Sequence, residues 1–136
     1  MSSPKFTDEP KQEDRFRYLF ESIQDAVIEL ELIDGDPIVR SVNPAFEDVF
    51  GYPPEEIRGK SLNNFIVPDE YEDEAAHLDS RTSDGKYNDA VLTRLTADGE
   101  REFLYRGVPY EQDGNRYAFA VYSDITDQKQ REAQLE

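Results

Sequence analysis

The chain has 136 residues, of which 31 are acidic and 15 are basic, giving a formal net charge of −16 at pH 7. Domains typically contain roughly 100–150 residues, so this length predicts a single domain with one hydrophobic core. Disordered chains are poor in aromatic residues, whereas this one has eight Phe and eight Tyr. The composition therefore indicates a folded domain with a strongly acidic surface.

Composition also excludes several classes of function. The sequence has no basic patch or stripe, which argues against binding to nucleic acid or to anionic lipid. It has no cysteine, which excludes disulfides, thiolate metal sites, cysteine nucleophiles and a flavin–cysteine adduct. No apolar run approaches the ~20 residues of a membrane span, and the N-terminus does not resemble a signal peptide. We therefore expect a cytoplasmic location.

Acidic residues are spread along the whole chain, and lysine is scarce. This pattern is typical of proteins from a high-salt cytoplasm, where salt screens the repulsion between carboxylates. The alternative is an ordinary acidic surface that serves only solubility. The even spread of the carboxylates favours the halophilic interpretation.

The first third of the chain predicts a helix followed by a β-hairpin. Residues 1–10 form a polar tail, and residues 11–24 form a helix with an apolar stripe. The stripe consists of Phe16, Leu19, Phe20 and Ile23. Alternating apolar residues from Ala26 to Leu32 predict a strand, and a turn at residues 34–37 leads into a second strand from Ile38 to Val42.

The middle of the chain predicts several short helices. Asn43 is a good N-cap, Pro44 suits the first helical position, and Gly51 suits the C-terminal cap. A turn of helix follows at residues 53–57, and residues 62–67 form a compact apolar piece. Pro68 is expected to open an acidic helix that closes at residues 83–85.

The last third predicts three strands and the start of a helix. The strands are expected at residues 87–95, 100–110 and 116–123, joined by hairpin turns. The chain reads as helical from Asp127 and stops inside this helix at Glu136, as an excised module would. Five strands in this order must share an antiparallel sheet to bury their apolar sides, with the short helices on one face. The predicted fold class is therefore α+β.

Three groups of residues resemble the PAS family, a family of sensor domains. They are Asn43-Pro44-Ala45-Phe46-Glu47 with the Gly51, Ile57 and Leu62 segments that follow it, then Ala97-Asp98-Gly99, and then Asp124-Ile125-Thr126. The resemblance covers roughly residues 16–131. It implies a PAS fold with strand order 2-1-5-4-3 and a core at residues 25–126. The flanking helices lie at residues 11–24 and 127–136.

The resemblance also implies a function. PAS domains serve as input modules of prokaryotic signalling proteins, so we expect the parent to be a sensor histidine kinase or a transducer-like protein, here of haloarchaeal type. Asp124 and Thr126 match the motif that joins a PAS core to its downstream helix, and we expect them to relay the signal. The flanking helices are expected to form a homodimer.

Strand parity and the resemblance together predict a ligand pocket between the sheet and the helices. Small residues at Gly107, Ala118 and Ala120 leave room there, and aromatic neighbours favour a small, largely apolar and possibly aromatic guest bound without a covalent bond. The twelve expected pocket residues are Ile28, Leu30, Phe46, Phe50, Ile57, Phe65, Leu92, Phe103, Tyr105, Ala118, Ala120 and Tyr122. Each of them also suits a plain hydrophobic core, with Phe and Tyr rings filling the space.

Other motifs in the sequence give weaker evidence of function. Gly59-Lys60-Ser61 resembles the end of a phosphate-binding loop, but the glycine spacing is wrong. The acidic run at residues 69–74 is expected to be a solvated helix face. His77 is the only histidine, and therefore the only candidate haem ligand. In haem-binding members of the family the ligand position corresponds to about Ala75, and two residues of helix turn His77 about 200° away from it.

Three functional classes remain open at this stage. The first is a ligand-sensing input module, and the second is a dimerisation and relay module with a filled core and no ligand. The third is a small stand-alone enzyme, which is disfavoured because no base and nucleophile form a pair. We expect no catalytic residue, no metal and no certain cofactor; a non-covalent flavin has no positive sign in the sequence.

Overall fold

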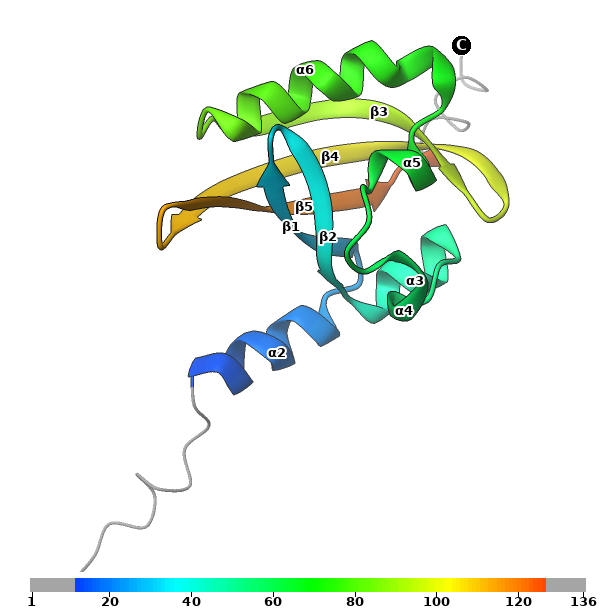
Figure 1. Ribbon diagram of the computed structural model, residues 1–136. Helices are drawn as coiled ribbons and strands as arrows, with labels where there is room; N and C mark the ends of the chain where they lie inside the picture. Colours follow the sequence, from blue (N-terminus) through cyan, green and yellow to red (C-terminus); the bar gives the residue numbers. More distant parts are fainter. Residues whose placement is uncertain (1–11, 127–136) are drawn as a thin grey trace, which may run out of the picture.

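The computed structural model describes residues 12–126, which form one antiparallel sheet with helices packed against it (Figure 1). In chain order the elements are helix α2 (Gln12–Ser22), strands β1 (Ala26–Ile33) and β2 (Asp36–Val42), helices α3 (Pro44–Phe50), α4 (Pro54–Ile57) and α5 (Asn63–Ile66), the 3₁₀ turn η1 (Asp69–Tyr71), helix α6 (Glu72–Ser83), and strands β3 (Asn88–Thr96), β4 (Gly99–Gln112) and β5 (Asn115–Asp124). The helix expected at residues 127–136 lies outside the described residues.

The sheet has five strands in the order β2-β1-β5-β4-β3, and every neighbouring pair is antiparallel. The first strand of the chain therefore lies beside the last, with Ile28 opposite Ala120. This arrangement confirms the predicted α+β fold and its strand order. It also places the end of β5 in the middle of the sheet, where it contacts both β1 and β4.

The first hairpin turn is tighter than the sequence suggested. Asp34 and Gly35 both have positive φ, at 52° and 82°, as a two-residue hairpin turn requires. The assignment of Asp36 and Pro37 to the turn was therefore wrong, since both belong to β2. Because β2 is an edge strand, the missing N–H of Pro37 breaks no ladder hydrogen bond on its outer side. Its carbonyl accepts a hydrogen bond from the backbone of Leu62 at 2.9 Å.

Asn43 begins α3 as predicted and also joins three segments of the chain. Its Oδ1 accepts backbone hydrogen bonds from Phe46 at 3.0 Å and from Val27 at 2.9 Å. Its Nδ2 donates to the carbonyl oxygens of Asp25 at 2.9 Å and Ile23 at 3.3 Å. The side chain is buried with its polar atoms satisfied. One amide thus fixes the exit of α2, the start of β1 and the first turn of α3.

The acidic segment after Pro68 is not one continuous helix. Residues 69–71 form a separate 3₁₀ turn, and the regular helix α6 begins only at Glu72. Along α6, Ala75 and Thr82 are buried and Leu78 is half-buried, a spacing that presents one side of the helix to the sheet.

The two faces of the sheet are covered differently (Figure 1). Helices α3 to α6 pack over the inner face, and the core lies between them and the sheet. Helix α2 contacts the outer face, where the Phe16 ring lies 5.5 Å from the Phe119 ring. Among residues 12–126, no helix is long and apolar enough to cross a membrane.

Candidate functional site

The structure brings the predicted pocket residues together between the sheet and the helices. Ten of them belong to a single buried cluster: Ile28, Leu30, Phe46, Phe50, Ile57, Leu92, Phe103, Tyr105, Ala120 and Tyr122. Phe65 is half-buried and packs against this cluster, and Ala118 is buried on the same strand as Ala120. Strand parity thus gave the correct inward-facing residues, and whether they bind a ligand stays a prediction.

Aromatic rings fill much of this interior. The Phe50 ring lies 4.9 Å from the Phe46 ring and 5.1 Å from the Phe103 ring, both in stacked geometry. The Tyr122 ring meets Phe50 and Phe103 edge-on, at 5.5 Å and 5.7 Å. Such pairs add about 0.5–1.5 kcal/mol each beyond the burial of their area. These rings stabilise one another in the space where the sequence predicted an aromatic guest.

A tyrosine also occupies the space beside the small residues. A Cβ atom built on Gly107 would lie 2.5 Å from the Tyr105 hydroxyl, so this hydroxyl lies directly over the glycine. Gly107 pairs with Ala120 across β4 and β5, and Tyr105 pairs with Tyr122. Gly107 therefore accommodates the Tyr105 side chain in this structure.

A small, partly open cavity of about 20 Å³ lies between β1, the last three strands and α6. This volume suits about one water molecule, which needs at least roughly 10–15 Å³. The residues that line it are Leu30, Pro37, Leu62, Asn63, Ala75, Leu78, Asp79, Arg94, Tyr105, Ala120 and Tyr122. Two charged side chains, Asp79 and Arg94, make this space polar, unlike the apolar pocket predicted from the sequence.

Arg94 is the buried cation of this cavity, with a residue exposure of 2%. Its Nη1 donates to Glu74 Oε1 at 2.9 Å and to the Thr93 carbonyl at 2.8 Å. No motif in the sequence singles out Arg94, although it lies two positions after Leu92 and therefore faces inward. Glu74, predicted to lie on a solvated acidic face, is half-buried against Arg94. A buried arginine requires such a partner.

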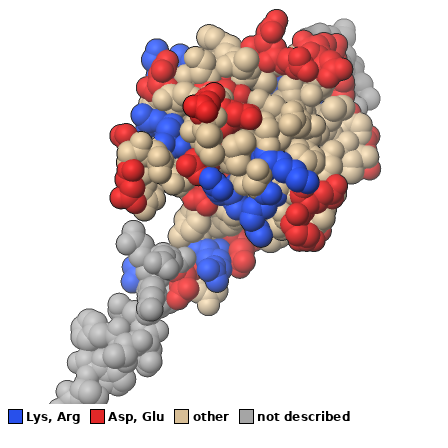
Figure 2. Space-filling model, viewed as in Figure 1, with Lys and Arg blue, Asp and Glu red and all other residues tan. Residues whose placement is uncertain are grey.

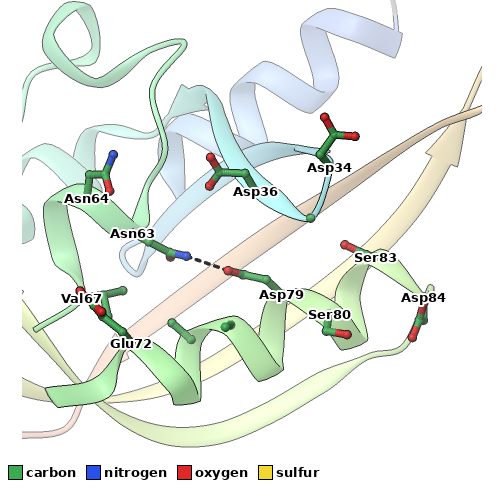
Figure 3. Close-up of a pocket in the computed structure, with 13 residues that line it drawn as sticks. Asp34, Asp36, Asn63, Asn64, Val67, Glu72, Asp79, Ser80, Ser83 and Asp84 are labelled. Carbon is green, nitrogen blue, oxygen red and sulfur yellow. Dashed lines mark hydrogen bonds between the residues drawn. The ribbon is translucent and has the colours of Figure 1, made fainter. Parts of the chain in front are cut away.

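Asp79 is the corresponding half-buried carboxylate on α6. Its Oδ2 accepts a hydrogen bond from Asn63 Nδ2 at 2.7 Å, which ties α6 to α5 (Figure 3). Burial raises the pKa of Asp79 to about 6, the Asn63 hydrogen bond opposes this, and the nearby Asp36 carboxylate adds to it. The sequence could have indicated this position, because Asp79 lies four residues after Ala75 and therefore on the same side of the helix.

A surface cleft of about 500 Å³ lies on the outer side of Asp79 (Figure 3). It runs between the β1–β2 turn, α5 and α6. Its charged lining residues are all acidic: Asp34, Asp36, Glu72, Asp79 and Asp84. Asn63, Ala75 and Asp79 line both this cleft and the internal cavity.

A polar cluster supports the C-terminal half of α6. Asn88 Nδ2 donates to Thr82 Oγ1 at 2.9 Å and to the Leu78 carbonyl at 3.0 Å, while its Oδ1 accepts from Arg81 Nε at 2.7 Å. Asn88 and Thr82 are both buried. This cluster fixes the end of α6 to the start of β3. Burial raises the pKa of the adjacent Tyr105, so its hydroxyl stays protonated.

His77 lies on the exposed side of α6, whereas Ala75 on the same helix is buried. This is the orientation that the sequence analysis expected for a histidine that does not face the pocket. Within residues 12–126 no group of three or more His, Cys, Asp or Glu side chains has the arrangement of a metal site.

The expected relay residues form a compact hydrogen-bonded joint at the end of β5. Thr126 Oγ1 accepts from the backbone N–H of Glu102 at 3.0 Å, and the Thr126 N–H donates to Asp124 Oδ1 at 2.9 Å. Asp124 Oδ2 accepts from Arg101 Nη1 at 2.7 Å. Partial burial alone would raise the pKa of Asp124, but the hydrogen bonds from Thr126 and Arg101 outweigh it and hold the pKa below its ordinary value.

Comparison with known proteins agrees with this architecture. The family model for the PAS fold matches residues 20–130, so the chain belongs to the PAS family. None of the curated proteins matches the chain.

Solved structures with the same fold include a domain of a sensor histidine kinase and a Light-Oxygen-Voltage receptor. The chain is similar to the PAS domain of an HTR-like protein from Haloarcula marismortui, with 22% identity, a TM-score of 0.69 and coverage of 90% of this chain and 97% of that one. It is also similar to a domain of a sensory box sensor histidine kinase/response regulator from Geobacter sulfurreducens, with 22% identity, a TM-score of 0.67 and coverage of 83% and 94%. An RNA-binding Light-Oxygen-Voltage receptor gives a TM-score of 0.77 at 19% identity over 91% of this chain, which spans about a third (35%) of that receptor. These similarities show the fold.

Proposed function

We propose that this chain is a cytoplasmic sensory input domain that relays the state of its core to an output domain of the parent protein, such as a histidine kinase. The observation that carries this proposal is the joint at Asp124 and Thr126. It connects the last strand to the residues that follow and also holds the backbone of the neighbouring strand at Glu102. The similarity to the solved domain of a sensor histidine kinase and to the PAS domain of an HTR-like protein supports it.

The joint suits a relay because it lies at the end of β5, where the chain leaves the core. Tyr122, which lies in the aromatic core, is two residues before Asp124 on the same strand. A movement of β5 relative to β4 would change the distance between Thr126 and Glu102, since Thr126 closely follows β5 and Glu102 lies on β4. Through these hydrogen bonds, a change in the packing of the core would reach Thr126.

Replacing Asp124 and Thr126 together with Ala tests this role. The change removes hydrogen bonds near the surface, so we expect the core to stay folded at a cost of about 1–2 kcal/mol. In the full-length parent protein, the output activity should no longer respond to the input signal. Stability is measured by urea unfolding of the chain and coupling by the activity of the parent.

Thr93→Ala is the matched control for this experiment. Thr93 Oγ1 donates to the side chain of the same residue, Glu102 Oε1 at 3.1 Å, but from the other neighbouring strand. Its removal should leave the response intact. A double variant that signals normally would contradict the relay role of Asp124 and Thr126.

Two further parts of the proposal concern binding partners. We propose that a small, largely apolar molecule binds without a covalent bond where the aromatic rings now lie, which requires Tyr105 to leave the space over Gly107. We also propose a homodimer through the flanking helices. Its support is the exposed apolar surface of α2, where Phe16, Tyr18 and Leu19 are 42%, 70% and 61% exposed.

A further inference from the structure

An open groove of about 980 Å³ lies where α2 meets the outer face of the sheet (Figure 1). Residues of α2 line it together with residues of β1, β2, β4 and β5, and Arg58, which follows α4, completes the lining. The sheet separates this groove from the core, which lies on the inner face. Its volume is in the range of sites that bind small molecules, about 300–1,000 Å³.

Aromatic rings give the groove an apolar surface. The Phe119 ring on β5 lies 5.3 Å from the Tyr110 ring on β4 and 5.5 Å from the Phe16 ring on α2. The Phe16 ring in turn lies 5.5 Å from the Phe20 ring. All four residues line the groove and form one continuous row of rings from β4 to α2. An aromatic ring of a ligand can stack against such a row.

Two arginines of the lining, Arg17 on α2 and Arg58, have unused hydrogen-bond donors. Neither has an ion-pair partner within residues 12–126. Arg58 Nε donates to the Arg40 carbonyl at 3.3 Å, which leaves the two terminal nitrogens of Arg58 available. This is unusual in a chain with 31 acidic and 15 basic residues. Arginine donors in this state fit a carboxylate, sulfonate or phosphate group.

The two carboxylates of the lining do not pair with these arginines. Glu29 Oε1 accepts from Ser41 Oγ at 3.1 Å, and Glu29 Oε2 accepts from the Tyr110 hydroxyl at 2.8 Å, so both oxygens are bonded within the sheet. Glu21 lies one turn after Arg17 on α2 and forms no ion pair with it. The groove therefore offers unused donors, whereas the charged residues that line the cleft beside Asp79 are all acidic.

The groove uses only one side of α2. Its four lining residues from this helix, at positions 16, 17, 20 and 21, fall within an arc of about 140°, because each residue of a helix turns by about 100°. Tyr18 and Leu19, which are 70% and 61% exposed, lie on the opposite side of the helix. A ligand in the groove is therefore compatible with a homodimer through these exposed residues.

We propose that this groove binds an organic anion that carries an aromatic ring. The ring stacks on the row that contains Phe119, and the anionic group accepts hydrogen bonds from Arg17 and Arg58. This goes beyond the sensory function proposed above, whose ligand is largely apolar and binds on the inner face of the sheet. Because the two sites lie on opposite faces, a failure of one leaves the other intact.

A matched pair of fluorescent probes tests the proposal. Anilinonaphthalene sulfonate carries both an aromatic ring system and an anionic group, and phenylnaphthylamine is the same ring system without the sulfonate. Each probe is titrated into the chain at one KCl concentration at which circular dichroism shows the chain and its variants to be folded. We expect one sulfonate probe to bind per chain, and to bind more tightly than the neutral probe.

Single substitutions then locate the bound probe. Arg17→Gln and Arg58→Gln should each raise the dissociation constant of the sulfonate by about three- to tenfold and leave that of the neutral probe unchanged. Phe119→Leu should weaken both probes, because it removes the ring on which they stack. Arg106→Gln is the matched control, since it removes the same charge from an exposed position of β4 outside the groove. It should change neither dissociation constant.

Three results would overturn the proposal. The first is a sulfonate probe that does not bind, or that binds no more tightly than the neutral probe. The second is sulfonate binding that is unchanged in Arg17→Gln and Arg58→Gln, which would place the probe elsewhere, for example on the inner face. The third is a homodimer that Arg58→Gln or Phe119→Leu converts into a monomer in sedimentation experiments, which would mean that a second copy of the chain occupies the groove.

Discussion

At the scale of single residues, Asp79 makes the stability of the fold depend on pH. Its pKa is about 6 in the folded chain against an ordinary 3.8, so the folded state binds the proton more tightly than the unfolded state. The contribution of protonated Asp79 to the free energy of unfolding is complete below about pH 4 and is lost as pH rises through 6. A shift of about two pKa units corresponds to at most about 3 kcal/mol of unfolding free energy. Because the Asp79 side chain is partly solvated, we expect a value of roughly 1–3 kcal/mol.

Asp79→Asn should therefore stabilise the chain at neutral pH. The difference in unfolding free energy between the variant and the unsubstituted chain should grow by about 1–3 kcal/mol from pH 4 to pH 7. Only the unsubstituted chain must bury a charge at this position. Urea unfolding at a series of pH values measures it, and taking the difference cancels the titration of the other carboxylates. Asp73→Asn, on the exposed side of the same helix, should give a flat difference. A flat difference for Asp79→Asn would show that Asp79 has no raised pKa.

Ala120 tests how full the interior is. It is 1% exposed and lines a cavity of only about 20 Å³, which is too small for the three additional carbon atoms of leucine. We expect Ala120→Leu to destabilise the chain by about 1–3 kcal/mol through overpacking, as measured by thermal or urea unfolding. Ala118→Leu, two residues away and outside the cavity lining, is the neighbouring comparison. If the Ala120→Leu variant is as stable as the unsubstituted chain, the interior can expand, and the proposal of a small apolar ligand gains support.

At the scale of elements, backbone patterns were predictable and side-chain placements were not. Alternation along the strands identified the inward residues, and the Asn43 cap with Gly51 gave the bounds of α3, because such signals depend on local geometry alone. The position of the Tyr105 ring over Gly107 depends on a rotamer, which no period in the sequence encodes.

The polar part of the core was missed for a related reason. Arg94 and Asp79 each lie at an inward position. A charged residue in a sequence is nevertheless expected to be exposed to solvent unless a partner for its charge is known. The partner of Arg94 is Glu74, twenty residues earlier in the chain, and the partner of Asp79 is Asn63, sixteen residues earlier. Only the packing of α6 against the sheet and next to α5 brings these pairs together. The candidate site could therefore be located from the sequence, while its chemistry could not.

At the scale of the whole molecule, the charge of −16 makes folding sensitive to salt. Figure 2 shows acidic side chains distributed over the visible face and not gathered in one place, so their repulsion acts on the fold as a whole. Multimolar KCl shortens the Debye length to about 3 Å or less, whereas 0.1 M salt lengthens it to about 10 Å. Removal of salt exposes each carboxylate to more of its neighbours. It also strengthens ion pairs such as Arg101–Asp124, but these are few compared with the excess negative charge.

We therefore propose that the protein belongs to a high-salt cytoplasm and expect its melting temperature to fall by many degrees between 3 M and 0.1 M KCl. Circular dichroism during heating measures this fall. Sucrose at matched osmolality separates screening from a general osmotic effect, since it stabilises compact states without shielding charge. Replacing the exposed Glu55 and Glu56 with Gln should reduce the salt dependence without disturbing the core, because neither side chain is buried. A melting temperature that is the same at both salt concentrations would mean that the carboxylates repel one another too weakly to matter, and the acidic surface would then serve solubility alone.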